Sequence, residues 1–140
     1  MNGGTPVRTD PMPGRSLWGE EERAAVERLF EQLREHGGAS MGYGGPEEQA
    51  FEQEFAEWMG GGFADGVNSG TNAVFAALGA LQLDAGSEVI VSPITDPGGA
   101  MPVAILNCVP VPADSAPGSY NMGPGQFEAA ITAKTRAVIV

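Results

Sequence analysis

Two short runs of β-branched residues constrain the fold of this sequence more than any other feature. EVIVS, at residues 88–92, and TRAVIV, at residues 135–140, are rich in apolar residues, which is typical of strands buried on both faces of a sheet. A weaker strand is predicted around residues 109–111. Because segments with helical periodicity lie between and before these strands, the sequence predicts an α/β fold with a mostly parallel sheet.

Apolar residues at helical spacing predict four helices. In the first, Val26, Leu29 and Phe30 begin an i, i+3, i+4 pattern on one face. A glycine-rich turn separates it from the second helix, in which a proline occupies the first turn and three glycines follow the last. The predicted helices cover residues 20–36, 46–59, about 70–81 and 124–131, with a turn at 39–45 and a short strand at 63–68.

The two ends of the sequence suggest how the chain is organised. Residues 1–18 are rich in Gly, Pro and Thr and show no periodicity, so we expect an extended N-terminal arm followed by one domain over residues 19–140. The last predicted strand ends at Val140 with an unpaired apolar edge, which natural domains usually avoid. We therefore expect the sequence to be the N-terminal portion of something longer.

The charge of the chain narrows the range of partners. There are 7 Lys and Arg against 18 Asp and Glu, for a formal net charge of −11. Cations are too few to neutralise a run of phosphates, so neither nucleic acid nor an anionic membrane is an expected partner. The acidic residues concentrate between positions 20 and 57, where they alternate with apolar ones as on the solvated face of a helix.

Neither a metal site nor a membrane segment is predicted. Cys108 is the only cysteine and His36 the only histidine, so a disulfide or a Cys/His metal site cannot form within one chain. A buried structural cysteine is expected at position 108. No apolar run reaches the length of a signal-peptide core or of the roughly 18 residues of a membrane span. We therefore expect a cytoplasmic protein without a zinc function.

The segment VNSGT, residues 67–71, runs directly into a predicted helix and is the candidate functional site. A phosphate-binding loop of the nucleotide-hydrolase type would end in a lysine, and this segment has none. The N–H groups and the dipole of a helix start can still hold a phosphate. The alternative is a helix capped by Ser69 with no ligand, and the residues alone leave both interpretations open. Ser69 is not a hydrolase nucleophile, because its context is not G-x-S-x-G.

Several segments, taken in order, resemble a known enzyme family. GYGGPEEQAFEQEFAEWMG is followed by VNSGTNAVFAALGALQLDAGSEVIVSPITD and then by PVPADSAPGSYNMGPGQFEAAITAKTRAVIV. This order is similar to the N-terminal part of the DegT/DnrJ/EryC1/StrS family of pyridoxal-phosphate-dependent sugar aminotransferases, from about residue 20 to residue 140. The resemblance implies an incomplete large domain of the aspartate-aminotransferase type, known as PLP fold type I, over residues 19–140.

The resemblance also implies a cofactor, a site and a reaction. Ser69, Gly70 and Thr71 would receive the phosphate of pyridoxal 5'-phosphate (PLP), with Gly70 letting the oxyanion approach the backbone and the Thr71 hydroxyl adding a donor. The implied reaction transfers an amino group from an amino-acid donor to a keto-sugar, often nucleotide-linked, or to a related cyclic ketone. A full-length relative would be expected to be a homodimer.

The sequence departs from a working enzyme of this family in two places. The family's essential lysine forms a Schiff base with the cofactor, whereas the only lysine here, Lys134, matches a surface turn. We therefore assign no catalytic residue and expect these 140 residues to be inactive alone. After Thr95, where many relatives carry a ring-stacking aromatic, stands Asp96, which either reflects a different ring support or a different substrate chemistry, or is a plain turn residue. A non-catalytic cofactor-binding or regulatory protein on the same fold, or an inactive remnant, is the alternative function.

Overall fold

The structure of the protein is a computed structural model that describes residues 4–5, 7–14, 17–36 and 44–140. Its internal contacts divide the chain into two compact units, Met1–Ala64 and Asp65–Val140. The described residues before position 19 form neither a helix nor a strand. The predicted glycine-rich turn at residues 39–45 lies largely outside the described residues.

The first unit carries the two predicted amphipathic helices, α1 (Glu20–His36) and α2 (Pro46–Trp58), and both predictions are confirmed. In α1, the Gly19 N–H donates to the Glu22 carboxylate over 2.7 Å, and this hydrogen bond holds the pKa of Glu22 below its usual range. In α2, Pro46 occupies the first turn, where its missing N–H costs nothing. Three aromatic rings follow one another on α2. The ring centroid of Phe55 lies 6.0 Å from that of Phe51 and 6.0 Å from that of Trp58.

The second unit is an α/β unit built from short elements. A helix comes first and is followed by a buried strand, a 3-10 turn and a one-turn helix, and then by strand, helix and strand. In chain order these elements are α3 (Gly70–Ala80), β1 (Glu88–Val91), η1 (Pro97–Gly99), α4 (Met101–Ile105), β2 (Val109–Pro112), α5 (Pro124–Ala130) and β3 (Thr135–Val138).

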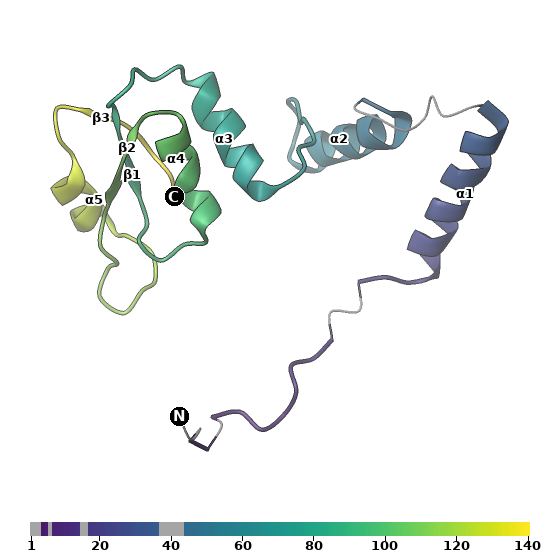
Figure 1. Ribbon diagram of the computed structural model, residues 1–140, viewed down its shortest axis with the longest axis horizontal. Helices are drawn as coiled ribbons and strands as arrows, with labels where there is room; N and C mark the ends of the chain where they lie inside the picture. The colour runs from purple at the N-terminus through teal and green to yellow at the C-terminus, as the bar shows by residue number, and fades with distance from the viewer. Residues whose placement is uncertain (1–3, 6, 15–16, 37–43) are drawn as a thin grey trace. The chain divides into compact units, whose positions relative to one another are not determined.

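The three strands form a parallel sheet in the order β2-β1-β3. Glu88 of β1 is in register with Val109 of β2 and with Thr135 of β3, and a register shift follows between Glu88 and Val89 on the β3 side. Figure 1 shows α5 on the other side of the strands from α3 and α4, so helices cover both faces of the sheet. The predicted α/β fold with a parallel sheet is confirmed, and a sheet covered on both faces explains the continuous apolar run of β1.

The core lies where β1 meets α3 and α4. Val89 and Val91 of β1 pack in one cluster with Leu78 of α3 and Val103 of α4, and Cys108 completes the cluster as a buried residue, as expected. Ile90 lies between the two valines, so its side chain faces the opposite side of the sheet, where it is also fully buried. The central strand therefore contributes to the packing on both faces.

One local prediction differs from the structure, and two short elements were not predicted. Residues 63–68, predicted as a strand, form irregular chain that runs into α3. Asp65, Gly66 and Asn68 are poor strand formers, and the segment pairs with none of the three strands of the sheet. The turn η1 and the helix α4 were not predicted, because a five-residue helix that contains Pro102 is too short to show a helical period.

The buried position of Ile90 leads to a stability prediction. We expect Ile90→Ala to lower the free energy of unfolding by about 2–5 kcal/mol, because the substitution leaves a cavity beside the central strand. Val138→Ala, in the neighbouring strand at 38% exposure, is the control and should cost much less. Urea denaturation measures both effects, and equal losses would contradict the placement of Ile90 in the core.

Candidate functional site

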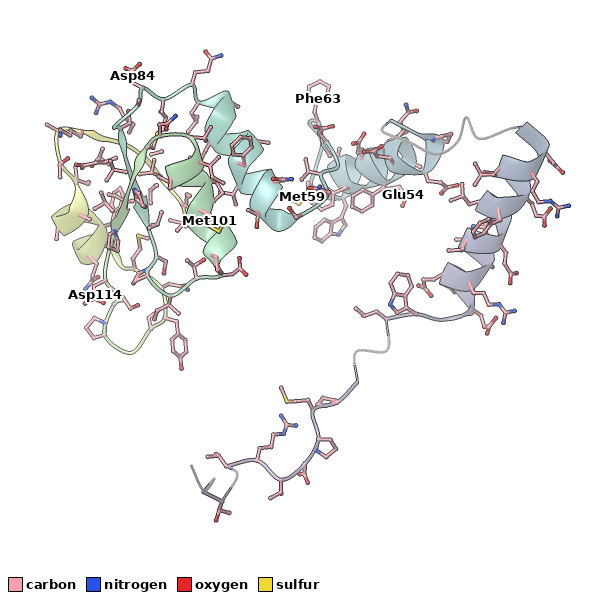
Figure 2. The ribbon with its side chains drawn as sticks, viewed as in Figure 1. Glu54, Met59, Phe63, Asp84, Met101 and Asp114 are labelled. Atoms are coloured by element: carbon pink, nitrogen blue, oxygen red, sulfur yellow. The ribbon has the colours of Figure 1, made fainter. Side chains whose placement is uncertain are left out.

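The candidate segment lies at the carboxyl edge of the sheet. Helix α3 precedes β1 and runs antiparallel to it, so the start of α3 lies near the end of β1, where η1 also begins. Asp84, before β1, and Asp114, after β2, lie at opposite ends of the strands in Figure 2 and mark the two edges. Since β1 connects onward to β2 on one side and pairs with β3 on the other, this edge carries a topological switch point, where α/β proteins bind ligands.

Ser69 caps α3, as one of the two sequence interpretations proposed. Its backbone is extended, at φ −167° and ψ 156°, and its hydroxyl oxygen accepts a hydrogen bond from the N–H of Asn72 over 3.2 Å. Its carbonyl accepts the N–H of Ala73 over 3.0 Å, the first bond of the helix. One residue earlier, the Asn68 side-chain oxygen accepts a 2.5 Å hydrogen bond from the side-chain amide of Asn72. The entry to α3 is therefore held by side chains on both sides of Ser69.

The first turn of α3 has the features that a phosphate group needs. Ser69 and Gly70 are exposed, Thr71 is half-buried, and a Cβ at position 70 would meet no other atom within 4 Å. This open space lets a large anion reach the backbone N–H groups, and the dipole of an 11-residue helix adds a partial positive charge there. Ser69, Gly70 and Thr71 therefore fit the phosphate of PLP, which needs donors and positive potential but no lysine.

The loop after β1 lies against this helix start. Its turn η1 is capped by Asp96, whose carboxylate accepts the Gly98 N–H over 2.7 Å. Gly98 is buried, and a Cβ built on it would lie 2.3 Å from Oγ1 of Thr71. Asp96 is thus a turn-capping residue, as one of the two sequence interpretations proposed, and the structure brings it and Gly98 to the predicted site. The sequence pattern did not indicate a role for Gly98.

Lys134 lies at the opposite edge of the sheet. It is exposed in the turn before β3, and its carbonyl accepts the N–H of Glu88, the first residue of β1, over 3.0 Å. The same turn is tied to β1 by a hydrogen bond from the Thr132 hydroxyl to the Glu88 carboxylate. A four-residue strand is about 13 Å long, so Lys134 is separated from the start of α3 by the length of the sheet. Its predicted position in a surface turn is confirmed.

Within the described ranges, no three His, Cys, Asp or Glu side chains come together in a way that could hold a metal ion. In the same ranges, no helix is both long enough and apolar enough to cross a bilayer.

These observations define an α/β protein with an open helix start, suited to an anion, at a switch point of its sheet. Residues 20–140 match the DegT/DnrJ/EryC1/StrS aminotransferase family, and the chain belongs to this family. The resemblance seen in the sequence is thereby confirmed over the range in which it was found.

Among curated relatives, the chain is similar to the L-glutamine:2-deoxy-scyllo-inosose aminotransferase of Micromonospora echinospora, with 36% identity over all of this chain and 33% of that protein. Among solved structures, it resembles the aminotransferase from Psychrobacter cryohalolentis, with 32% identity, a TM-score of 0.81, and coverage of 91% of this chain and 31% of that one. A Streptococcus pneumoniae protein described as a sugar aminotransferase, solved in its PLP form, matches with 25% identity, a TM-score of 0.72, and coverage of 83% and 29%. The chain thus spans about a third of the length of these relatives, and its fold is that of the N-terminal portion of a PLP fold type I aminotransferase.

The cap at Ser69 leads to a second stability prediction. We expect Ser69→Ala to lower the free energy of unfolding by about 1 kcal/mol, because the Asn72 N–H loses its acceptor. Ser69→Asn keeps a capping oxygen and is the matched control, with a change near zero. Chemical denaturation measures both. A loss for Asn as large as that for Ala would contradict the capping role of the side-chain oxygen.

Proposed function

We propose that Ser69, Gly70 and Thr71 hold the phosphate of PLP in an aminotransferase that transfers an amino group from an amino acid to a keto-sugar or related cyclic ketone. The observation that carries this proposal is the open first turn of α3 at the carboxyl edge of the sheet, in a chain of this family. The three residues bind the cofactor and orient it. When bound, PLP supplies the electron sink for the chemistry at the amino group.

Each residue of the site contributes differently to binding the phosphate. Gly70, without a side chain, leaves room for the oxyanion to approach the N–H groups of the first turn. Thr71 adds a hydroxyl donor, and Ser69 holds the turn in place through its hydrogen bond with Asn72. The net charge of −11 opposes anion binding at long range, so the attraction must come from these local donors and the helix dipole.

The names of relatives support a finer proposal about the substrates. The Micromonospora echinospora relative is named for L-glutamine and 2-deoxy-scyllo-inosose, which is a cyclic ketone. We propose a similar pair here, an amino-acid donor such as glutamine or glutamate and a keto-sugar or inosose acceptor, with a nucleotide-linked sugar as the wider alternative. We further propose a cytoplasmic homodimer in which residues 1–18 form an arm and residues 19–140 belong to one large domain.

The position of Lys134 supports a proposal about the covalent link to the cofactor. Lys134 is the only lysine, and it lies at the sheet edge opposite the start of α3. We propose that the lysine which joins the cofactor is supplied from outside these 140 residues, and that residues 1–140 alone do not catalyse transamination. This matches a chain that spans about a third of its relatives' length.

The reaction can be tested directly on the complete gene product. The purified protein is supplied with PLP, L-glutamine or L-glutamate and 2-deoxy-scyllo-inosose or a nucleotide-linked keto-sugar, and mass spectrometry detects the amino product. We expect amino transfer to at least one acceptor by the complete protein and none by residues 1–140. Cofactor binding without transfer to any ketone would favour the non-catalytic alternative.

The phosphate site can be tested by a pair of substitutions that differ in charge alone. Ser69→Asn and Ser69→Asp both keep a capping oxygen for the helix, but Asp places a negative charge beside the phosphate. We expect the dissociation constant for PLP to be at least about tenfold higher in the Asp variant than in the Asn variant, with the gap narrowing at high salt. Fluorescence titration with PLP measures it. Equal affinities would place the phosphate elsewhere.

A further inference from the structure

We propose that Gly98 and Asp96 are positioning residues for the phosphate site, and that they act by fixing the Thr71 hydroxyl. This inference rests on the proposed function, because it assigns to the loop after β1 a task in holding the phosphate of PLP. Neither residue needs to touch the cofactor, so neither is a catalytic residue. Both residues act on the phosphate site through the Thr71 side chain, in the first turn of α3.

The first observation is the close approach of Thr71 to Gly98. A Cβ built on Gly98 would lie 2.3 Å from Oγ1 and 3.2 Å from Cβ of Thr71 and 2.8 Å from Oδ1 of Asp96, so the Thr71 hydroxyl and the Asp96 carboxylate together fill the space that any side chain at position 98 would need. Gly98 is buried, and its φ lies outside the left-handed region, so the glycine is required for space and not for backbone conformation. Thr71 is therefore packed against backbone on this side.

The second observation is the hydrogen bonding that holds Gly98 in place. The Asp96 carboxylate accepts the Gly98 N–H over 2.7 Å, and the Asp96 carbonyl accepts the Gly99 N–H over 3.0 Å. Pro97, the first residue of the turn, has a restricted φ, which further limits its freedom. Asp96 thus closes η1 from both its side chain and its backbone, and the turn presents Gly98 to α3 in a defined position.

Together these contacts restrict the Thr71 side chain. Of the three proposed phosphate ligands, Ser69 and Gly70 are exposed, whereas Thr71 is half-buried against the turn. A hydroxyl donor held in one rotamer binds an anion better than a free one, because less rotamer entropy is lost on binding. The turn η1, with its cap Asp96, then has a physical task, which is to support the phosphate end of the proposed cofactor site.

The test compares a phosphorylated ligand with one that lacks the phosphate. Apparent dissociation constants for PLP and for pyridoxal are measured by fluorescence titration on the complete protein and on Gly98→Ala. We expect Gly98→Ala to weaken PLP binding by about tenfold or more and to leave pyridoxal binding within about twofold, because the added methyl group displaces the Thr71 hydroxyl and also presses on the Asp96 carboxylate that caps the turn. Gly79→Ala, in the same helix as Thr71, is the matched control, since a Cβ there meets nothing within 4 Å, and neither constant should change.

Two further variant sets show whether the effect passes through Thr71 and Asp96. In a Thr71→Ala background, where the hydroxyl is absent, Gly98→Ala should cost much less PLP affinity than in the wild type, a non-additive result. Asp96→Asn keeps an oxygen that can accept the Gly98 N–H and should bind PLP like the wild type, whereas Asp96→Ala should lose selectivity for PLP over pyridoxal. If Gly98→Ala does not fold, the comparison of Asp96→Ala with Asp96→Asn tests the positioning role in its place.

The outcomes separate this inference from the proposed function. If the wild type binds PLP no more tightly than pyridoxal, the phosphate site itself is wrong, and the inference is wrong with it. If the wild type prefers PLP but Gly98→Ala, or Asp96→Ala in its place, keeps that preference, the phosphate site stands and the positioning role is overturned. An equal loss of PLP and pyridoxal binding shows a general structural role and also overturns the inference.

Discussion

The burial of β1 is the constraint on which the rest of the second unit depends. This strand pairs with β2 on one side and with β3 on the other, and its side chains are buried on both faces. The neighbouring strands occupy both edges of β1. The helices that precede and follow β1 therefore pack on one of its apolar faces. The packing of α3 and α4 against Val89 and Val91 then determines where the start of α3 lies.

The same packing produces the site. In a parallel sheet, a helix that leads into a strand begins at the strand's carboxyl edge, so its unsatisfied N–H groups face the place where the chain leaves the next strand. The chain leaves β1 through the turn η1, which meets the start of α3 at Gly98 and Thr71. Residues more than twenty positions apart in the sequence thereby lie on one surface, although the elements that carry them are short.

The proposed anion site has a particular electrostatic character. The chain has an excess of acidic residues, and its single lysine lies at the far edge of the sheet. A phosphate held here would depend on short-range interactions, namely backbone N–H groups, hydroxyls and a helix dipole, all of which lose strength within a few ångströms. Such a site is sensitive to small displacements, and a tightly packed turn beside Thr71 keeps those displacements small.

The sequence by itself determined the class of fold, the positions of α1, α2, α3 and α5 and the three strands, and it offered capping by Ser69 as one interpretation. These features depend on local patterns, namely apolar periodicity, β-branched runs and capping residues, which act over a few neighbouring positions. It predicted a strand at residues 63–68 that does not form, because strand formation depends on a pairing partner that local pattern does not show. Only the tertiary structure placed Lys134 far from the start of α3, made Asp96 the cap of η1 and brought Gly98 against Thr71. These are relations between distant segments, and they arise from packing on β1, which no single segment specifies.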